Sequence, residues 1–136
     1  MPIEHRIDEK TGILHIRRWG AVKTHDEELA MQKRKEDLLA VPNIPVLVDC
    51  REVDPPDSTE VVQYLANKVM SLAAELGCGP VAILVNSDVE YGMARMYMAL
   101  TELKHPNTMV FRGYDNALKW LREESKKTGD GNSPHS

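Results

Sequence analysis

The amino-acid sequence predicts a single α/β domain, and three observations support this prediction. Short apolar strands alternate with helices along the chain with few residues between them, which is typical of α/β domains. The length of 136 residues suits one domain with one modest core. Hydrophobic residues make up 42% of the chain and charged residues 28%, close to the composition of an ordinary globular protein.

The first predicted element is a β-hairpin. Two strands, over residues 4–7 and 13–19, flank a polar loop that ends in Gly12, the residue type that most easily takes a positive φ. Neither face of the second strand is cleanly apolar, so the pattern does not say which face packs inward.

A helix is predicted next, over residues 25–40. Thr24 is its expected N-cap, and Glu27 stands at capping-box spacing. The basic triplet at 33–35 has acidic neighbours within helical reach and is interpreted as part of a solvated face. The helix is therefore expected on the surface with a thin apolar stripe. Its clearest apolar anchors are Leu29, Leu38 and Leu39.

The middle of the chain predicts a buried strand and a long amphipathic helix. Residues 46–50 are a short and largely apolar run, framed by prolines. A helix over residues 58–76 follows, and Gly77 supplies its C-terminal stop. Apolar residues recur on one face of this helix: Val62, Leu65, Val69, Leu72 and Leu76.

The last third repeats the strand–helix pattern twice. Residues 81–85 form a strand, and a helix over 87–103 starts with a capping box made by Ser87 and Glu90. Residues 108–111 are the last strand, and a helix over 114–125 has Trp120 as its expected core anchor. The predicted core face of the 87–103 helix consists of Val89, Met93, Met96, Leu100 and Leu103. We expect a domain over residues 1–125 and a disordered tail over 126–136.

The resulting order is β-β-α-β-α-β-α-β-α, which favours a mixed, mostly parallel sheet flanked by helices. Three segments within this order are informative: Tyr91-Gly92-Met93-Ala94-Arg95-Met96-Tyr97, Val110-Phe111-Arg112 and Ala117-Leu118-Lys119-Trp120-Leu121. Through these segments and the order of its elements, the chain over residues 3–122 resembles the SpoIIAA-like single-domain bacterial proteins, which are related to STAS domains and largely uncharacterised.

The resemblance implies one candidate regulatory residue. In STAS domains that antagonise anti-sigma factors, a serine at a helix start is the phosphorylation switch, and Ser58 of this chain falls near that position. Glu60 departs from the family pattern because it replaces a glycine with a carboxylate. The alternative is that Asp57 and Ser58 simply mark the start of an ordinary helix, with Asp57 as its cap.

A second candidate site lies on the helix over residues 87–103. Tyr91, Ala94, Arg95 and Met98 are expected opposite its core face, where a solvated helix would carry Lys and Glu. Such a strip is typical of a surface that a protein partner or a second copy of the chain covers. The alternative is that another element of the same chain covers it.

Other chemistry-bearing residues give weaker signals. Asp49 and Asp54 follow a predicted parallel strand, where α/β sheets place ligand sites, but loop aspartates beside proline are also common turn formers. Cys50 is expected to be a small buried hydrophobe. The five histidines are scattered and no C-x-x-C occurs, so neither a metal site nor a cofactor is expected.

Charge and cysteine content narrow the classes of partner. The formal net charge is −4 and no basic stripe is present, so nucleic-acid binding is not expected. Two cysteines suit a reduced, cytoplasmic protein, and no apolar run is long enough for a membrane helix. The leading hypothesis is a non-enzymatic STAS-like regulatory or interaction domain. The alternative is a carrier of a small molecule or lipid, because SpoIIAA-like domains also resemble the CRAL-TRIO lipid-transfer fold.

Overall fold

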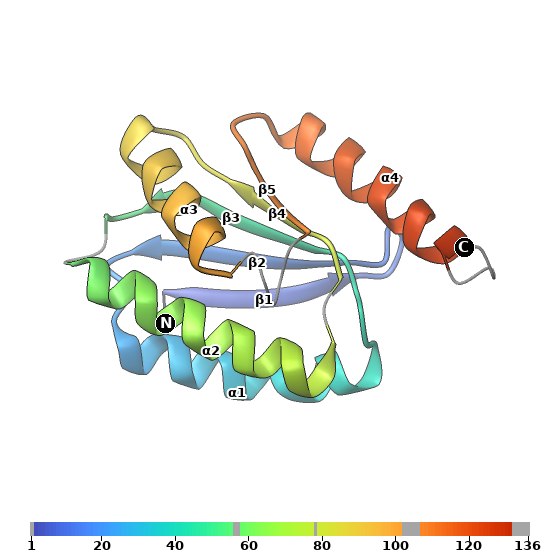
Figure 1. Ribbon diagram of the computed structural model, residues 1–136, viewed down its shortest axis with the longest axis horizontal. Coiled ribbons are helices and arrows are strands. Elements are labelled where there is room, and N and C mark those ends of the chain that lie inside the picture. Colours follow the sequence, from blue (N-terminus) through green and yellow to red (C-terminus); the bar gives the residue numbers. More distant parts are fainter. Residues whose placement is uncertain (1, 56–57, 78, 102–106, 132–136) are drawn as a thin grey trace.

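The computed structural model describes residues 2–55, 58–77, 79–101 and 107–131, and these contain five strands and four helices (Figure 1). In chain order the elements are β1 (Ile3–Asp8), β2 (Ile13–Gly20), α1 (Thr24–Ala40), β3 (Val46–Val53), α2 (Thr59–Leu76), β4 (Val81–Leu84), α3 (Asp88–Thr101), β5 (Thr108–Phe111) and α4 (Tyr114–Gly131). The predicted order of elements is confirmed.

The strands form one mixed sheet in the order β1-β2-β3-β4-β5. β1 and β2 are antiparallel, and the remaining neighbours are parallel. The hairpin closes at Gly12, which has a φ of 71° and donates its N–H to the Asp8 carbonyl at 2.7 Å. Each later strand returns through a helix, which parallel pairing requires. The predicted fold class is therefore confirmed.

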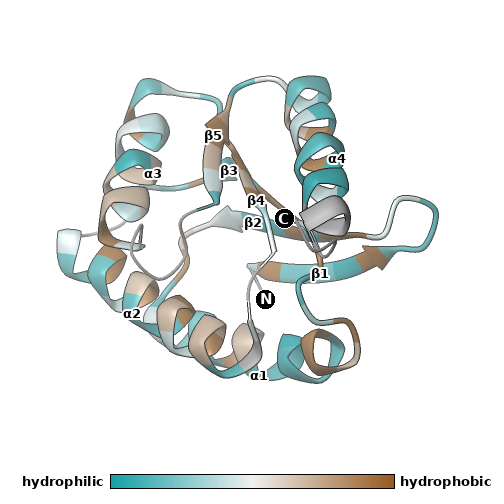
Figure 2. Ribbon diagram, turned by 45° about the vertical axis from the view of Figure 1, so that its right-hand side comes forward, coloured by the Kyte–Doolittle hydropathy of each residue, from teal (hydrophilic) through white to brown (hydrophobic). Residues whose placement is uncertain are grey.

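Helices cover both faces of this sheet. α4 packs on one face, and α1, α2 and α3 lie on the other (Figures 1 and 2). Because strand residues alternate between the faces, Ile13 of β2 turns toward α4 while Leu14 turns toward α1. Both faces of β2 are thus buried at this end of the strand.

The core beneath α4 is fully packed. Its buried members are Ile13, Leu47, Ala82, Leu84, Ala117 and Leu121. Trp120, the predicted anchor, is only partly buried and packs at the edge of this core, with its ring 5.7 Å from that of Phe111. Ala117 and Leu121 are completely buried and are the true anchors of α4.

α4 is longer than the sequence indicated. It continues to Gly131, so the predicted helix end at about Ser125 is wrong and residues 126–131 are helical. The rest of the predicted tail, residues 132–136, lies outside the described residues.

α1 differs from the prediction in its N-cap. The N-cap residue is Lys23, not Thr24, and the Asp26 carboxylate accepts a hydrogen bond from the Lys23 N–H at 3.0 Å. Asp26 takes the position in the capping box that was predicted for Glu27. Glu27 is thereby left to turn inward.

Of the three predicted anchors of α1, only Leu38 is confirmed, since it is partly buried against the core. The buried residues of this helix are Glu27, Ala30, Met31 and Arg34. The predicted anchors Leu29 and Leu39 are 42% and 58% exposed. Leu29 and Leu39 stay exposed because the inward face of the helix carries two charged side chains, Glu27 and Arg34, whose contacts are described below.

In α3, too, the buried face differs from the predicted one. Ser87 and Glu90 form the predicted capping interaction, since the Glu90 N–H donates to Ser87 Oγ at 3.2 Å. The predicted core residues Val89 and Leu100, however, are 54% and 37% exposed, and Ala94 is buried instead. Leu103 lies outside the described residues.

The packing beneath α4 predicts the effect of a cavity-forming substitution. Leu121→Ala should lower the free energy of unfolding by about 2–5 kcal/mol, because it removes a fully buried side chain from a closed core. Lys119→Ala, on the exposed side of the same helix, is the control and should change it by less than about 0.5 kcal/mol. Urea denaturation measures both, and equal effects would show that α4 is not docked as described.

Candidate functional site

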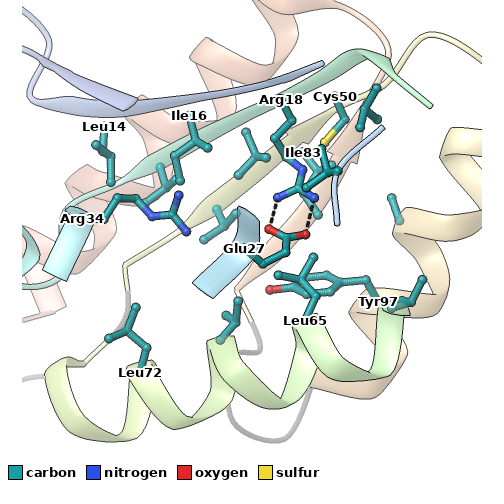
Figure 3. A pocket seen from close by; sticks show the side chains of 18 of the residues that line it. Leu14, Ile16, Arg18, Glu27, Arg34, Cys50, Leu65, Leu72, Ile83 and Tyr97 are labelled. Carbon is teal, nitrogen blue, oxygen red and sulfur yellow. Dashed lines mark hydrogen bonds and ion pairs between the residues drawn. The ribbon is translucent and has the colours of Figure 1, made fainter. Parts of the chain in front are cut away.

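A cavity of about 250 Å³ lies between the sheet and helices α1, α2 and α3 (Figure 3). The predicted apolar face of α2 lines it through Val62, Leu65, Val69 and Leu72. The opposite wall is the helix-facing side of β2, β3 and β4. Val62 and Ala66 of α2 are buried, and the cavity lies between the apolar face of this helix and the sheet.

A buried ion pair lies in this cavity (Figure 3). Arg18, near the end of β2, donates from Nη1 to Glu27 Oε1 at 2.7 Å and from Nη2 to Glu27 Oε2 at 2.5 Å. The side chains are 13% and 2% exposed. Burial alone would lower the pKa of Arg18, but the hydrogen bonds and charge of Glu27 outweigh it and raise that pKa. The pair stays ionised and pins α1 to β2.

Arg34 adds a second guanidinium to the same cavity. It is 7% exposed, and its buried Nη1 has no hydrogen-bond partner among the described residues. Burial, followed by the repulsion of Arg18, lowers the pKa of Arg34 to about 10, so the group is still charged at neutral pH. Arg18, Glu27 and Arg34 together leave one uncompensated positive charge inside an apolar pocket.

Tyr97 and Cys50 are two further residues with polar side-chain atoms that line the cavity. Burial raises the pKa of the Tyr97 hydroxyl, which therefore remains a hydrogen-bond donor. Burial also raises the pKa of the Cys50 thiol to about 11, so it is not a nucleophile near neutral pH. The arrangement is suited to holding an anion rather than to bond making.

The sequence prediction missed Arg18, Glu27 and Arg34. The sequence pattern predicts a capping role for Glu27 and a solvated position for Arg34 in the basic triplet, but both residues are buried. A signal was nevertheless present: Glu27 and Arg34 stand seven residues apart, on the same helix face as Ala30 and Met31. The side-chain alternation of β2 likewise places Arg18 on the apolar face with Leu14 and Ile16, and this position could have been suspected.

Ser58 is the N-cap residue of α2 and is exposed. Its backbone is extended, and its side chain makes no capping hydrogen bond to the helix. Asp57, the predicted cap, lies outside the described residues. Val61 and Val62, in the first turn of the same helix, line the cavity.

Asp49 and Asp54 do not form a carboxylate pair. Asp49 accepts hydrogen bonds from Arg51 Nε at 3.0 Å and Nη2 at 2.9 Å. Partial burial would raise the pKa of Asp49, but the Arg51 hydrogen bonds outweigh it and lower that pKa. Asp54 is exposed and lines the cavity, whereas strand alternation puts Asp49 on the face that carries Leu47 and α4.

Other residues of the same chain cover much of the predicted strip on α3. Ala94 is 8% exposed and belongs to a buried cluster, against which Tyr91 packs. The guanidinium groups of Arg95 and Arg112 lie 5.8 and 5.2 Å from the centre of the Tyr91 ring. Arg95 is exposed and Met98 half-buried. Ala94 therefore cannot contribute to a surface, and intramolecular cover accounts for much of Tyr91.

The described residues contain neither a cluster of metal-ligating side chains nor a membrane-spanning helix. Within the described residues, no group of three or more His, Cys, Asp or Glu side chains is placed to hold a metal ion. No helix in the described ranges is long and apolar enough to cross a membrane.

Comparison with solved structures shows a SpoIIAA-like fold. One similar structure is an uncharacterised protein of the DUF3478 family with a SpoIIAA-like fold from Shewanella loihica PV-4, with a TM-score of 0.60 and 19% identity over 88% of this chain and 91% of that one. Another is the anti-sigma factor antagonist SpoIIAA in its unphosphorylated form, with a TM-score of 0.59 and 17% identity over 89% of this chain and 96% of that one. At these identities the likeness concerns the fold.

Comparison with family models identifies the family. Residues 7–125 match the model described as Domain of unknown function (DUF7793), and the chain belongs to that family. No curated protein matches the sequence.

The cavity charges predict opposite effects on stability. Arg34→Met should raise the free energy of unfolding by about 1 kcal/mol or more, because it removes an unpaired buried cation and keeps most of the apolar volume. Glu27→Gln should lower it by about 3–5 kcal/mol, because it leaves Arg18 buried without its counter-charge. Urea denaturation near neutral pH measures both, and a large loss of stability in Arg34→Met would contradict the description of Arg34 as unpaired.

The raised pKa of Cys50 predicts slow alkylation. Raising a thiol pKa from 9.0 to about 11 reduces the thiolate fraction at neutral pH about a hundredfold. A Cys78→Ser variant, which leaves Cys50 as the only thiol, should therefore react with iodoacetamide about a hundredfold more slowly when folded than when unfolded in urea. Equal rates would show that Cys50 is neither buried nor perturbed.

Proposed function

We propose that this chain is a non-catalytic regulatory domain of the STAS type that acts by binding a protein partner. The observation that carries the proposal is the state of Ser58. Its hydroxyl is exposed at the N-terminal end of α2 and makes no capping hydrogen bond to the helix. A phosphate at this position would meet unpaired backbone N–H groups and the positive end of the helix dipole.

A phosphate or a bound partner at Ser58 would act on the N-terminal end of α2 and could thereby change the position of the helix. The first turn of this helix carries Val61 and Val62, which line the cavity. A phosphate would add about two negative charges at the docking surface, beside the carboxylate of Glu60. We propose that this change of charge decides whether the partner binds.

The side chains that could have suggested an enzyme are held in unsuitable states, which supports the non-catalytic assignment. The Cys50 thiol is protonated near neutral pH, and Arg51 neutralises Asp49. The free thiol of Cys50 also fits a reducing compartment, so we propose the cytoplasm as the place of action.

A carrier of the lipid-transfer type is less well supported. The cavity of about 250 Å³ lies below the roughly 300–1,000 Å³ of sites that enclose drug-sized ligands. Homodimerisation through Arg95 and Met98 remains a prediction, now without the contribution of Ala94.

Site-specific crosslinking tests the docking proposal. A photo-reactive amino acid at position 59, in the first turn of α2, should give one dominant adduct with a protein partner in the native cell. Ser58→Glu should reduce the yield of that adduct tenfold or more, because the added charge sits at the docking surface.

The other end of α2 provides the matched control. Ser71 is exposed on the same helix, so Ser71→Glu adds the same charge away from the helix start and should leave the yield unchanged. Equal losses in both variants, or no loss with Ser58→Glu, would contradict docking at Ser58. An adduct between two copies of the chain would replace the separate partner with a homodimer.

A further inference from the structure

We infer that the cavity between the sheet and helices α1–α3 binds a small monoanionic amphiphile, whose acidic head group pairs with Arg34. This inference goes beyond the docking proposed at Ser58 and does not depend on it. It assigns a ligand class to a pocket whose walls are apolar and whose interior carries one uncompensated positive charge.

The first step of the argument is the cost of Arg34. A buried guanidinium without a counter-charge costs several kcal/mol of solvation free energy. Glu27 offsets this cost only in part: its charge raises the pKa of Arg34, but its hydrogen bonds come from Arg18. Of the other acidic residues at the cavity, Asp54 is exposed, and Glu90 accepts the Asn86 N–H at 2.7 Å.

The second step concerns the charge of the head group. Arg18, Glu27 and Arg34 sum to one positive charge, so a single negative charge balances these three groups. A carboxylate can accept from the free Nη1 of Arg34 in a charge-assisted hydrogen bond, the stronger class of such bonds. The Tyr97 hydroxyl, which burial keeps protonated, lines the same cavity as a further donor. In Figure 3 the Arg34 guanidinium extends into the space between the sheet and α2.

The third step concerns the tail. The rest of the wall is aliphatic, with Leu65, Val69 and Leu72 on one side and Val46 and Val48 on the other. The cavity volume of about 250 Å³ lies below the roughly 300–1,000 Å³ of sites for drug-sized ligands, so it suits a smaller molecule with one short chain. A medium-chain carboxylate matches both the charge and the volume, whereas a two-chain phospholipid is too large.

Calorimetric titration of the intact chain tests the inference, with octanoate as the probe. Octanoate should bind saturably with one site per chain. Octan-1-ol lacks the charge and octylammonium reverses it, and both should bind at least tenfold more weakly. Acetate, which has the head group without the tail, should also bind at least tenfold more weakly. In methyl NMR spectra, octanoate should shift Leu65, Val69 and Leu72 of the cavity wall.

Variants distinguish a specific contact between Arg34 and the ligand from a general effect of positive charge on α1. Arg34→Met should weaken octanoate binding roughly 10- to 100-fold, as expected for loss of a charge-assisted hydrogen bond. Arg34→Lys keeps the charge and should retain part of the affinity. Lys33→Met removes a positive charge from the exposed neighbour on the same helix and should leave the affinity unchanged. Thermal denaturation without ligand confirms that each variant is folded.

Three outcomes would overturn the inference. Equal affinity for octanoate and octan-1-ol would show a merely apolar cavity. Unchanged octanoate affinity in Arg34→Met would place the anion elsewhere. No binding of any probe to a folded parent would show that the cavity does not take a ligand of this class. None of these results bears on crosslinking at α2, so the docking proposal is decided separately.

Discussion

The buried ion pair between Arg18 and Glu27 is the interaction on which the helix arrangement around the cavity depends. It joins the end of β2 to the first turns of α1 with two hydrogen bonds in a fixed geometry. Because Glu27 must face inward to make it, the rotation of α1 is set, and Arg34 seven residues later faces inward as well. The exposure of Leu29 and Leu39 follows from the same rotation. One ionic contact thus determines both the helix orientation and the excess charge in the cavity.

The two faces of the sheet have different tasks. Beneath α4 the side chains close into a packed core around Leu121, which gives this half of the protein its stability. On the other face α2 is tied to α1 by polar contacts, from the Tyr64 hydroxyl to Glu28 and between Lys35 and Glu75 at 2.9 Å. Val62 and Ala66 of α2 are buried, and the rest of its apolar face borders the cavity. α2 therefore packs partly against neighbouring side chains and partly against open space, whereas α4 covers a cluster of buried side chains.

This difference connects the two proposals physically. Ser58 stands at the start of α2, and Arg34 reaches toward the same helix from across the cavity. A ligand that fills the cavity would fix α2, and a charge at Ser58 would act on its N-terminal end. The retention of an unpaired buried arginine, which lowers stability, is understandable when function requires the charge. The SpoIIAA-like fold provides the scaffold, and the cavity provides chemistry of this chain's own.

The sequence by itself determined the elements and their order, because these depend on local signals. Apolar periodicity, the turn at Gly12 and the capping residues Ser87 and Glu90 act within a few residues of one another, and their outcomes agree with the structure. The sequence did not determine which face of α1 or α3 is buried, or that a cavity forms beneath α2. A charged residue such as Glu27 turns inward only when another strand supplies its counter-charge, and Arg18 meets it through the tertiary fold alone.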